Sequence, residues 1–228
     1  MTSDRILEAD FDEMGRRWFG LGNLRSTCWF IGMEPGGTED PAWPTEWATK
    51  FGAAPVVDLA ECSGDENRRW LGEYNVMHPT WSPLIRTRLA YAGLPCDDRS
   101  VLDYQREKFC RADGGEAFLE LSPYAARNLD VDVPRERYIE ERIAELRAMI
   151  AEYRPEIVVC YGATYRAYFA NLCGGAFDDD GFRWSDDTLC ALVPHPKPRF
   201  KEPQPAETWI ALGAELRARV REGRSAAA

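Results

Sequence analysis

A glutamate lies in a glycine-rich turn directly after an apolar run near the start of the chain. Residues 29–31 are Trp-Phe-Ile, and residues 32–37 are Gly-Met-Glu-Pro-Gly-Gly. Glycines let the backbone approach a ligand closely, and Pro35 stiffens the turn. A carboxylate held there, Glu34, could orient or deprotonate a water molecule. The alternative is an ordinary strand-to-helix turn that carries an exposed carboxylate.

A second loop combines a histidine with closely spaced cations. His195 is one of only two histidines, and prolines at positions 194, 196 and 198 make its loop rigid and extended. The loop also holds the densest basic cluster of the chain together with one aromatic residue, namely Lys197, Arg199, Phe200 and Lys201. A rigid backbone, cations and an apolar wedge suit a nucleic-acid strand that is gripped while one base is pushed out. The alternative is a solvated basic loop.

Both loops resemble signature motifs of the uracil-DNA glycosylase superfamily. Residues 32–36 are similar to its G-x-[N/D/E]-P-G motif, and residues 195–198 are similar to its H-P-x-P motif. The two motifs occur in the family's order, towards opposite ends of the chain. Residues 118–123 resemble the family's middle strand, whose end lines the base pocket, and residues 157–162 resemble its fourth-strand-to-helix turn.

This resemblance implies a DNA glycosylase, which hydrolyses the N-glycosidic bond of a flipped-out base and leaves an abasic site. Cleavage builds positive charge on the sugar and negative charge on the departing base. By motif position, Glu34 would stabilise the sugar and direct the attacking water, and His195 would donate to a carbonyl oxygen of the base. The residues expected to bind the substrate are Gly32, Met33, Pro35, Gly36, Tyr74, Asn75 and Ser122. Those expected to bind DNA are Lys197, Arg199, Phe200 and Lys201, and no cofactor or metal ion is expected.

The chain departs from the family at positions that bear on the substrate. Glu34 stands where two branches have asparagine, and Lys197 stands where the second motif usually has serine. The asparagine that reads uracil in the best-known branch has no clear equivalent, although Ser122 and Asn128 lie near its position. The cysteine spacing cannot supply the four ligands of the iron–sulfur branches. Two substrate classes therefore stay open: uracil or another damaged pyrimidine, and a bulkier base such as the hypermodified cytosine of phage DNA.

The net charge bears on the alternative functions. A formal charge of −10 argues against an extended surface for nonspecific nucleic-acid binding, but it leaves room for a small basic patch. A noncatalytic nucleic-acid or nucleotide-binding module on the same fold is therefore the alternative. An unrelated hydrolase has no support from the motifs, because the chain lacks both a G-x-S-x-G nucleophile turn and a phosphate-binding loop.

The composition predicts a single domain over residues 1–228. Hydrophobic residues make up 45% of the chain and charged residues 29%, as in soluble globular proteins. No apolar run approaches the roughly 20 residues that span a bilayer, and the N-terminus lacks the features of a secretory signal. Seven scattered cysteines without a C-x-x-C pair favour reduced thiols. We expect a cytoplasmic monomer that binds DNA and no membrane.

Alternating apolar runs and amphipathic stretches predict a three-layer α/β/α sandwich with a central, mostly parallel four-stranded sheet. The predicted strands are residues 27–31, 117–121, 157–161 and 189–193. Apolar residues at helical spacing predict helices near residues 7–18, 139–153, 165–172 and 209–220. Residues 38–80 are polar and broken by proline and glycine, yet rich in large aromatics, so we expect this inserted segment to fold over something. Its histidine, His78, is either a site residue or, by preference, the cap of a helix that begins near Ser82.

Overall fold

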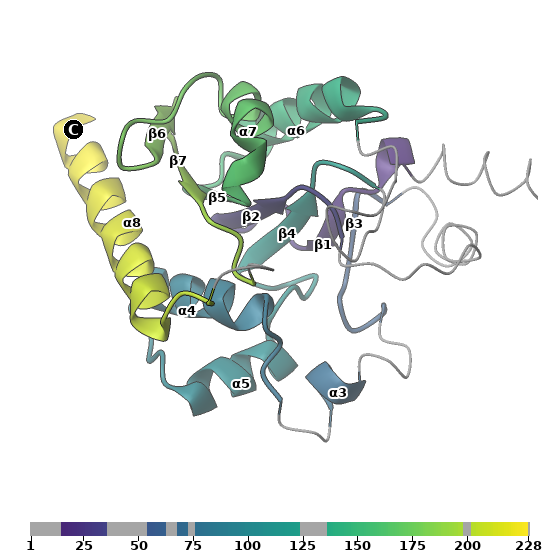
Figure 1. The fold of residues 1–228 in the computed structure, drawn as a ribbon, viewed down its shortest axis with the longest axis vertical. Coiled ribbons are helices and arrows are strands. Elements are labelled where there is room, and N and C mark those ends of the chain that lie inside the picture. Colours follow the sequence, from purple (N-terminus) through teal and green to yellow (C-terminus); the bar gives the residue numbers. More distant parts are fainter. Residues whose placement is uncertain are drawn as a thin grey trace, which may run out of the picture.

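The computed structural model describes residues 15–35, 54–62, 68–72, 76–123, 136–197 and 202–227. Its centre is one seven-stranded sheet with the order β3-β1-β4-β2-β5-β7-β6, and helices pack on both faces of it (Figure 1). The strands are β1 (Gly20–Gly22), β2 (Cys28–Gly32), β3 (Val56–Val57), β4 (Glu116–Glu120), β5 (Ile157–Tyr161), β6 (Phe182–Ser185) and β7 (Thr188–Val193).

All four predicted strands are confirmed, and they form the middle of the sheet. β4, β2, β5 and β7 are neighbours and run parallel to one another. Every residue of β2, β4 and β5 is buried, which explains why β2 and β5 are almost continuously apolar, whereas β4 carries a glutamate at each end. The sheet is larger than predicted, because three further strands extend it. β1 has two glycines, β3 has two residues and β6 is partly exposed, so none of them carries the apolar run that identified the others.

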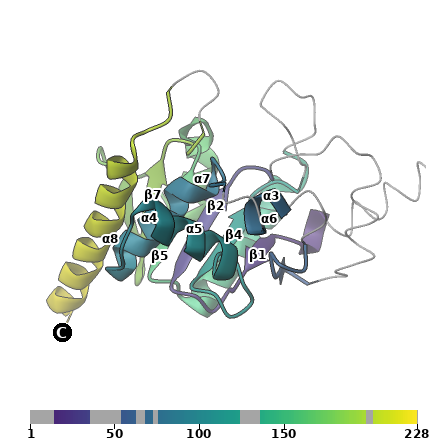
Figure 2. The same ribbon diagram turned by 90° about the horizontal axis from the view of Figure 1, so that it is seen from below.

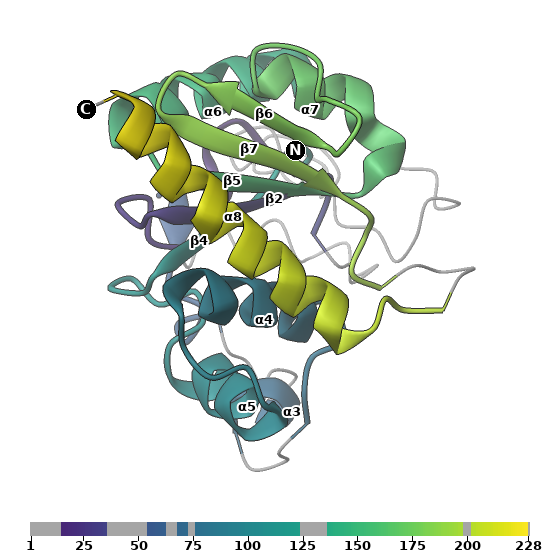
Figure 3. The ribbon, with the colours of Figure 1, turned by 90° about the vertical axis from the view of Figure 1, so that its left-hand side faces the viewer.

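Each face of the sheet has its own core. On one face, side chains of α4 (Trp81–Ala92), α5 (Asp98–Glu107) and α8 (Ala206–Ala227) pack against residues such as Phe30, Phe118 and Val159. Figure 2 shows α4 and α5 in front of the strands, and Figure 3 shows α8 running diagonally beside α4. On the other face, α6 (Ile139–Tyr153) and α7 (Arg166–Leu172) cover residues such as Trp29, Ile31 and Val158. Successive strand residues thus point to opposite cores.

The structure confirms three of the predicted helices. α6 begins and ends as predicted, α7 follows Gly162 after a short 3-10 helix (Ala163–Tyr165), and α8 starts directly after Pro205. Of the predicted N-terminal helix, residues 15–17 are described and are helical, and the rest lies outside the described residues. α5 was not predicted, although Asp97 caps it by accepting a hydrogen bond from the Ser100 N–H at 3.0 Å.

Parts of the segment 38–80 are described, and they pack against α4 and α5. The ring of Trp70, in the short helix α3 (Arg68–Leu71), lies 4.7 Å from the ring of His78. His78 Nδ1 accepts from the N–H groups of Thr80 and Trp81, both at 3.2 Å, so its predicted capping role is confirmed. The aromatics Trp43, Trp47 and Tyr74 lie outside the described residues.

The seven cysteines form no disulfide, and their thiols are free. Among the described residues, no helix combines the length and the apolar character that crossing a membrane requires.

A buried arginine ties three separate segments together behind the carboxyl end of β4. Arg142 of α6 is 1% exposed. Its guanidinium donates to four backbone carbonyls, those of Gly15 (2.5 Å), Trp18 (2.9 Å), Glu120 (2.8 Å) and Leu121 (2.6 Å). Burial lowers the pKa of Arg142 to about 9, and the nearby Glu120 raises it. The planar fork of arginine can serve several acceptors at once, which the single ammonium of lysine cannot do in the same geometry.

We expect Arg142→Met to lower the free energy of unfolding by about 3 kcal/mol, because four buried carbonyls lose their donor. Urea denaturation measures this change. Arg147→Met is the matched control, since Arg147 is exposed on the same helix and should change stability by less than about 0.5 kcal/mol. Equal effects of the two substitutions would contradict this view of Arg142.

Candidate functional site

Three neighbouring parallel strands end together at one edge of the sheet. Gly32, Glu120 and Tyr161 are the last residues of β2, β4 and β5, and Gly32 pairs with Glu120 in the sheet register. β7 ends at Val193, two residues before His195. In open parallel sheets, ligands bind beyond the carboxyl ends of the strands. This edge is therefore where the chain would be expected to hold a ligand.

A carboxyl group and a phenol meet over Gly32. The Tyr161 hydroxyl donates to Glu120 Oε1 at 3.0 Å, and the two residues are 3% and 2% exposed. Among the described residues, Glu120 Oε2 has no hydrogen-bond partner. A Cβ atom at position 32 would lie 2.2 Å from the Tyr161 hydroxyl oxygen and 2.3 Å from Glu120 Oε2. Glycine at this position thus leaves the space that the two side chains need.

Glu120 is a carboxyl group with an unusual charge environment. Its pKa is raised to about 8, mainly by burial and also by the charge of Glu34, whereas the Tyr161 hydrogen bond and the charge of Arg142 act in the opposite direction. Because this pKa lies above neutrality, Glu120 keeps its proton at pH ~7. Glu34 lies two residues beyond Gly32, the last residue of β2, which pairs with Glu120 in the sheet register.

His195 approaches the same pair from β7. Its ring packs edge-on against the Tyr161 ring, with centroids 5.6 Å apart. Partial burial lowers the pKa of His195, a hydrogen bond with the Lys197 backbone raises it, and the charge of Lys197 lowers it, so the net shift favours the neutral imidazole. Nδ1 lies 3.0 Å from the Lys197 N–H and 2.9 Å from the Lys197 carbonyl oxygen. When the N–H donates to Nδ1, the ring proton resides on Nε2, which can then donate to a ligand.

A continuous series of ring contacts connects the two histidines of the chain. Centroid distances between successive rings are 4.0, 5.5, 6.0, 5.8 and 5.6 Å along His78, Trp81, Phe109, Phe118, Tyr161 and His195. Burial and, to a smaller extent, the charge of Lys197 lower the pKa of His78 to about 4. This series of rings leads from the start of α4 through the core to the loop after β7.

The two predicted catalytic residues are linked to the Glu120–Tyr161 pair by different observations. His195 packs against the Tyr161 ring, and the charge of Glu34 acts on the pKa of Glu120. Pro35 is half-buried and Lys197 is exposed. The predicted residues Gly36, Tyr74, Asn75, Arg199, Phe200 and Lys201 lie outside the described residues.

Two predicted substrate-binding residues are placed differently from the prediction. The Met33 side chain is 5% exposed and packs in the core beneath α6 and α7, because it points to the same face as Ile31. Ser122 has no exposed surface, and its N–H donates to the Met33 carbonyl oxygen at 2.6 Å. These two residues continue the β2–β4 pairing past the strand ends. The structure also explains why position 32 is a glycine: without a side chain there, Tyr161 and Glu120 have the space they need.

Glu120 and Tyr161 were not predicted as site residues, because both belong to predicted strands. A signal was present. Glu120 is a charged residue within the otherwise apolar run 117–121, and burial of an acid in a strand covered on both faces needs a reason. Tyr161 gave a weaker signal, because a tyrosine at a strand end is usually ordinary packing.

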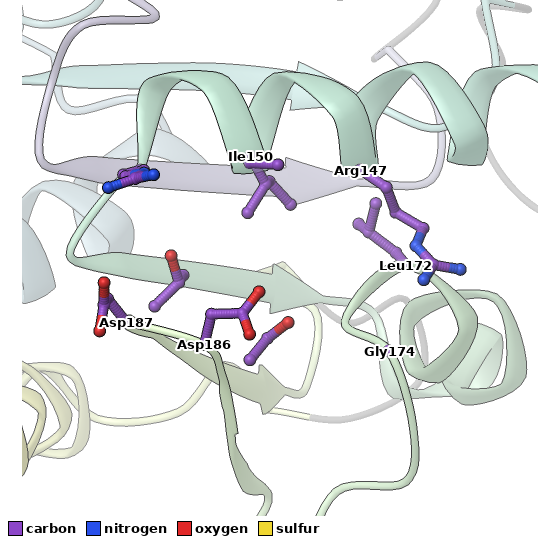
Figure 4. Close-up of a pocket in the computed structure, with 10 residues that line it drawn as sticks. Arg147, Ile150, Leu172, Gly174, Asp186 and Asp187 are labelled. Carbon is purple, nitrogen blue, oxygen red and sulfur yellow. The ribbon is translucent and has the colours of Figure 1, made fainter.

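A hollow of about 340 Å³ lies elsewhere, between the C-terminal half of α6, the end of α7 and the β6–β7 turn (Figure 4). Arg147 lines it from α6, and Asp186 and Asp187 line it from the turn. It borders Thr188, the first residue of β7, so it lies at the opposite end of that strand from His195. This hollow contains none of the predicted site residues. Within the described part of the chain, no three His, Cys, Asp or Glu side chains are grouped to hold a metal ion.

We expect Gly32→Ala to disrupt the site, because the added methyl group collides with Tyr161 and Glu120. Thermal unfolding should show a destabilisation of about 1–3 kcal/mol. Gly15→Ala is the comparison, since its Cβ would meet the side chains of Pro123 and Tyr138 at 3.2 and 3.3 Å, which shifts of a few tenths of an ångström relieve, and it should destabilise the protein less. If Gly32→Ala were as well tolerated as Gly15→Ala, the placement of both side chains would be wrong.

Glu120→Gln should stabilise the protein more at pH ~8 than at pH ~5. In the wild type, the pKa of Glu120 rises from 4.5 in the unfolded chain to about 8 in the folded protein. Between these values unfolding releases a proton, so wild-type stability falls as the pH rises, by up to about 1.4 kcal/mol per pH unit. Glutamine removes this loss. Melting temperatures of both proteins across this range test the prediction, and a constant difference between them would contradict it.

No protein-family model matches the chain, and no curated protein matches it.

Proposed function

We propose that this protein is a DNA glycosylase that hydrolyses the N-glycosidic bond of a flipped-out pyrimidine and leaves an abasic site. The proposal rests on the motif resemblance of residues 32–36 and 195–198 to the uracil-DNA glycosylase superfamily. The single observation that supports it best is the convergence of Glu34 and His195 on the buried Glu120–Tyr161 pair. A carboxylate and an imidazole that border one edge of a parallel sheet are the two groups that this reaction needs.

The two groups have complementary roles in the proposed reaction. The Glu34 carboxylate stabilises the positive charge that develops on the sugar and directs the attacking water. His195 donates Nε2–H to a carbonyl oxygen of the base, on which negative charge develops as the bond breaks. The lowered pKa of His195 favours the uncharged ring, and in the tautomer whose Nδ1 accepts from the Lys197 N–H the ring proton is on Nε2, ready for this donation.

Binding of the strand is assigned to the loop after His195. Lys197 is exposed beside His195 and would contact a phosphate. Residues 198–201, which lie outside the described residues, are proposed to extend this contact. With a net charge of −10, the protein would bind through this local patch rather than through an extended basic surface.

The net charge also favours a second candidate, a noncatalytic nucleic-acid or nucleotide-binding module with the same fold. This candidate and the glycosylase share the site but differ in one outcome. A binder retains the base on the strand, whereas a glycosylase releases it. Release of free base from bound DNA therefore decides between them.

We expect Glu34→Gln to lower the rate of abasic-site formation by about 10²–10⁴-fold, because the water loses its base. His195→Ala should lower it by about 10²–10³-fold, because the departing base loses a donor. The assay is single-turnover cleavage of strands that carry uracil or hydroxymethylated cytosine, in single- and double-stranded form. Glu202→Gln is the control, since Glu202 is exposed and lies beyond the loop.

If Glu34→Gln and His195→Ala both formed abasic sites at the wild-type rate, the catalytic roles proposed for Glu34 and His195 would be wrong. DNA binding by the wild type without release of any base would favour the noncatalytic candidate. Base release by the wild type that requires Glu34 and His195 supports the glycosylase.

A further inference from the structure

Two buried glutamates on β4 face the same core but differ in how their oxygens are satisfied. Glu116 Oε1 accepts from the Cys110 N–H at 2.7 Å, and Glu116 Oε2 accepts from the Tyr104 hydroxyl at 2.5 Å. The guanidinium of Arg88 lies 3.7 Å from the same Oε2. Glu116 thus has a partner for each oxygen, as buried polar groups in folded proteins usually do. It is a structural carboxylate.

In Glu120, only one of the two carboxyl oxygens has a hydrogen-bond partner among the described residues. Oε1 accepts from Tyr161, and Oε2 is buried with no hydrogen-bond partner among the described residues. A buried polar atom without a partner costs about 1–3 kcal/mol. Glu116 lies at the amino end of β4, away from the site, whereas Glu120 lies at the carboxyl end, beside Glu34 and His195. An unsatisfied group at this end indicates that its partner arrives with the ligand.

The groups around Glu120 favour its neutral, protonated form. Glu34 adds a negative charge from the turn after β2, and Tyr161 of β5 contributes a hydroxyl rather than a charge. Arg142 of α6 is the nearby cation, but the hydrogen bonds of its guanidinium go to backbone carbonyls. His195 packs on Tyr161. Since Tyr161 donates to Oε1, the carboxyl proton belongs on Oε2.

We propose that Glu120 Oε2 donates a hydrogen bond to the ligand of this site, and that the ligand presents a carbonyl oxygen or an unprotonated ring nitrogen there. The inference rests on the proposed function in that the ligand is taken to be the displaced pyrimidine. Oε1 keeps a second lone pair, so the protonated carboxyl can also accept an N–H from the next position on the ring. A pyrimidine edge offers such an acceptor beside a donor. Glu120 is then a specificity-determining residue, and Tyr161 is the positioning residue that orients it.

The test measures how much the base contributes to binding. Each strand carries one 2′-fluoro nucleotide, whose electron-withdrawing fluorine disfavours the positive charge that cleavage requires. The base is uracil in one strand and hydroxymethylated cytosine in another, and a third strand carries an abasic site at that position. The ratio of Kd for the abasic strand to Kd for a base-containing strand is the base contribution. It is measured for the wild type, Glu120→Gln, Glu120→Ala and Tyr161→Phe.

For at least one base, the wild-type contribution should fall about five- to tenfold as the pH rises through about 8, the pKa of Glu120. Glu120→Gln should keep the contribution at every pH, because its amide offers the same donor and acceptor without titrating. Glu120→Ala should lose it at every pH, and Tyr161→Phe should weaken it. Glu116→Gln is the matched control on the same strand and should leave the contribution and its pH dependence unchanged.

Three outcomes would overturn the inference: a full base contribution in Glu120→Ala, the same pH dependence in wild type and Glu120→Gln, or no base contribution in the wild type for either base. Should Glu120→Ala fail to fold, the comparison of wild type with Glu120→Gln still decides. Cleavage of ordinary strands separates this inference from the proposed function. If the base contribution depends on Glu120 but no abasic site forms, the inference holds and the glycosylase proposal is wrong. If the wild type cleaves and Glu120→Ala cleaves equally well, the glycosylase proposal holds and the inference is wrong.

Discussion

The hydrogen bond between Tyr161 and Glu120 crosses the end of β2, and it is possible only because position 32 has no side chain. Three adjacent strands must end in register for these residues to meet, so the bond depends on the parallel centre of the sheet. The charge of Glu34 raises the pKa of Glu120, and the ring of His195 packs on the phenol ring of Tyr161.

Two ionisable side chains, Arg142 and Glu120, are buried at this end of the sheet, and their hydrogen bonds are satisfied to different extents. Arg142 shares its hydrogen bonds among four carbonyls and so holds together the chain segments on which the end of β4 rests. Glu120 is left with an unsatisfied oxygen a short distance away. Rigid support next to an incompletely satisfied group is the arrangement expected where a protein sacrifices stability for ligand binding. By contrast, Glu116 at the other end of the strand has a partner for each oxygen.

The position of the site agrees with a general property of parallel sheets. Side chains at the carboxyl edge come from the last residues of the strands and from the turns that follow them, and the strands are held by two cores. The hollow at the β6–β7 turn has volume but none of these features, since it adjoins the start of β7 and contains none of the converging residues. The Glu120–Tyr161 pair and the aligned strand ends therefore favour the carboxyl edge of the sheet over this hollow as the candidate site.

The sequence by itself determined the four central strands, three helices, the cap formed by His78 and two loops with reactive side chains. These features depend on local patterns, because apolar runs, helical spacing and prolines act over a few residues. It could not determine that Met33 points into the core, that Gly32 makes room for other side chains, or that the Tyr161 hydroxyl donates a hydrogen bond to Glu120. Those facts depend on the order in which strands that are distant in the chain lie side by side. Only tertiary packing removed Glu120 from water, and burial is the physical cause that turned an ordinary acid into a candidate donor.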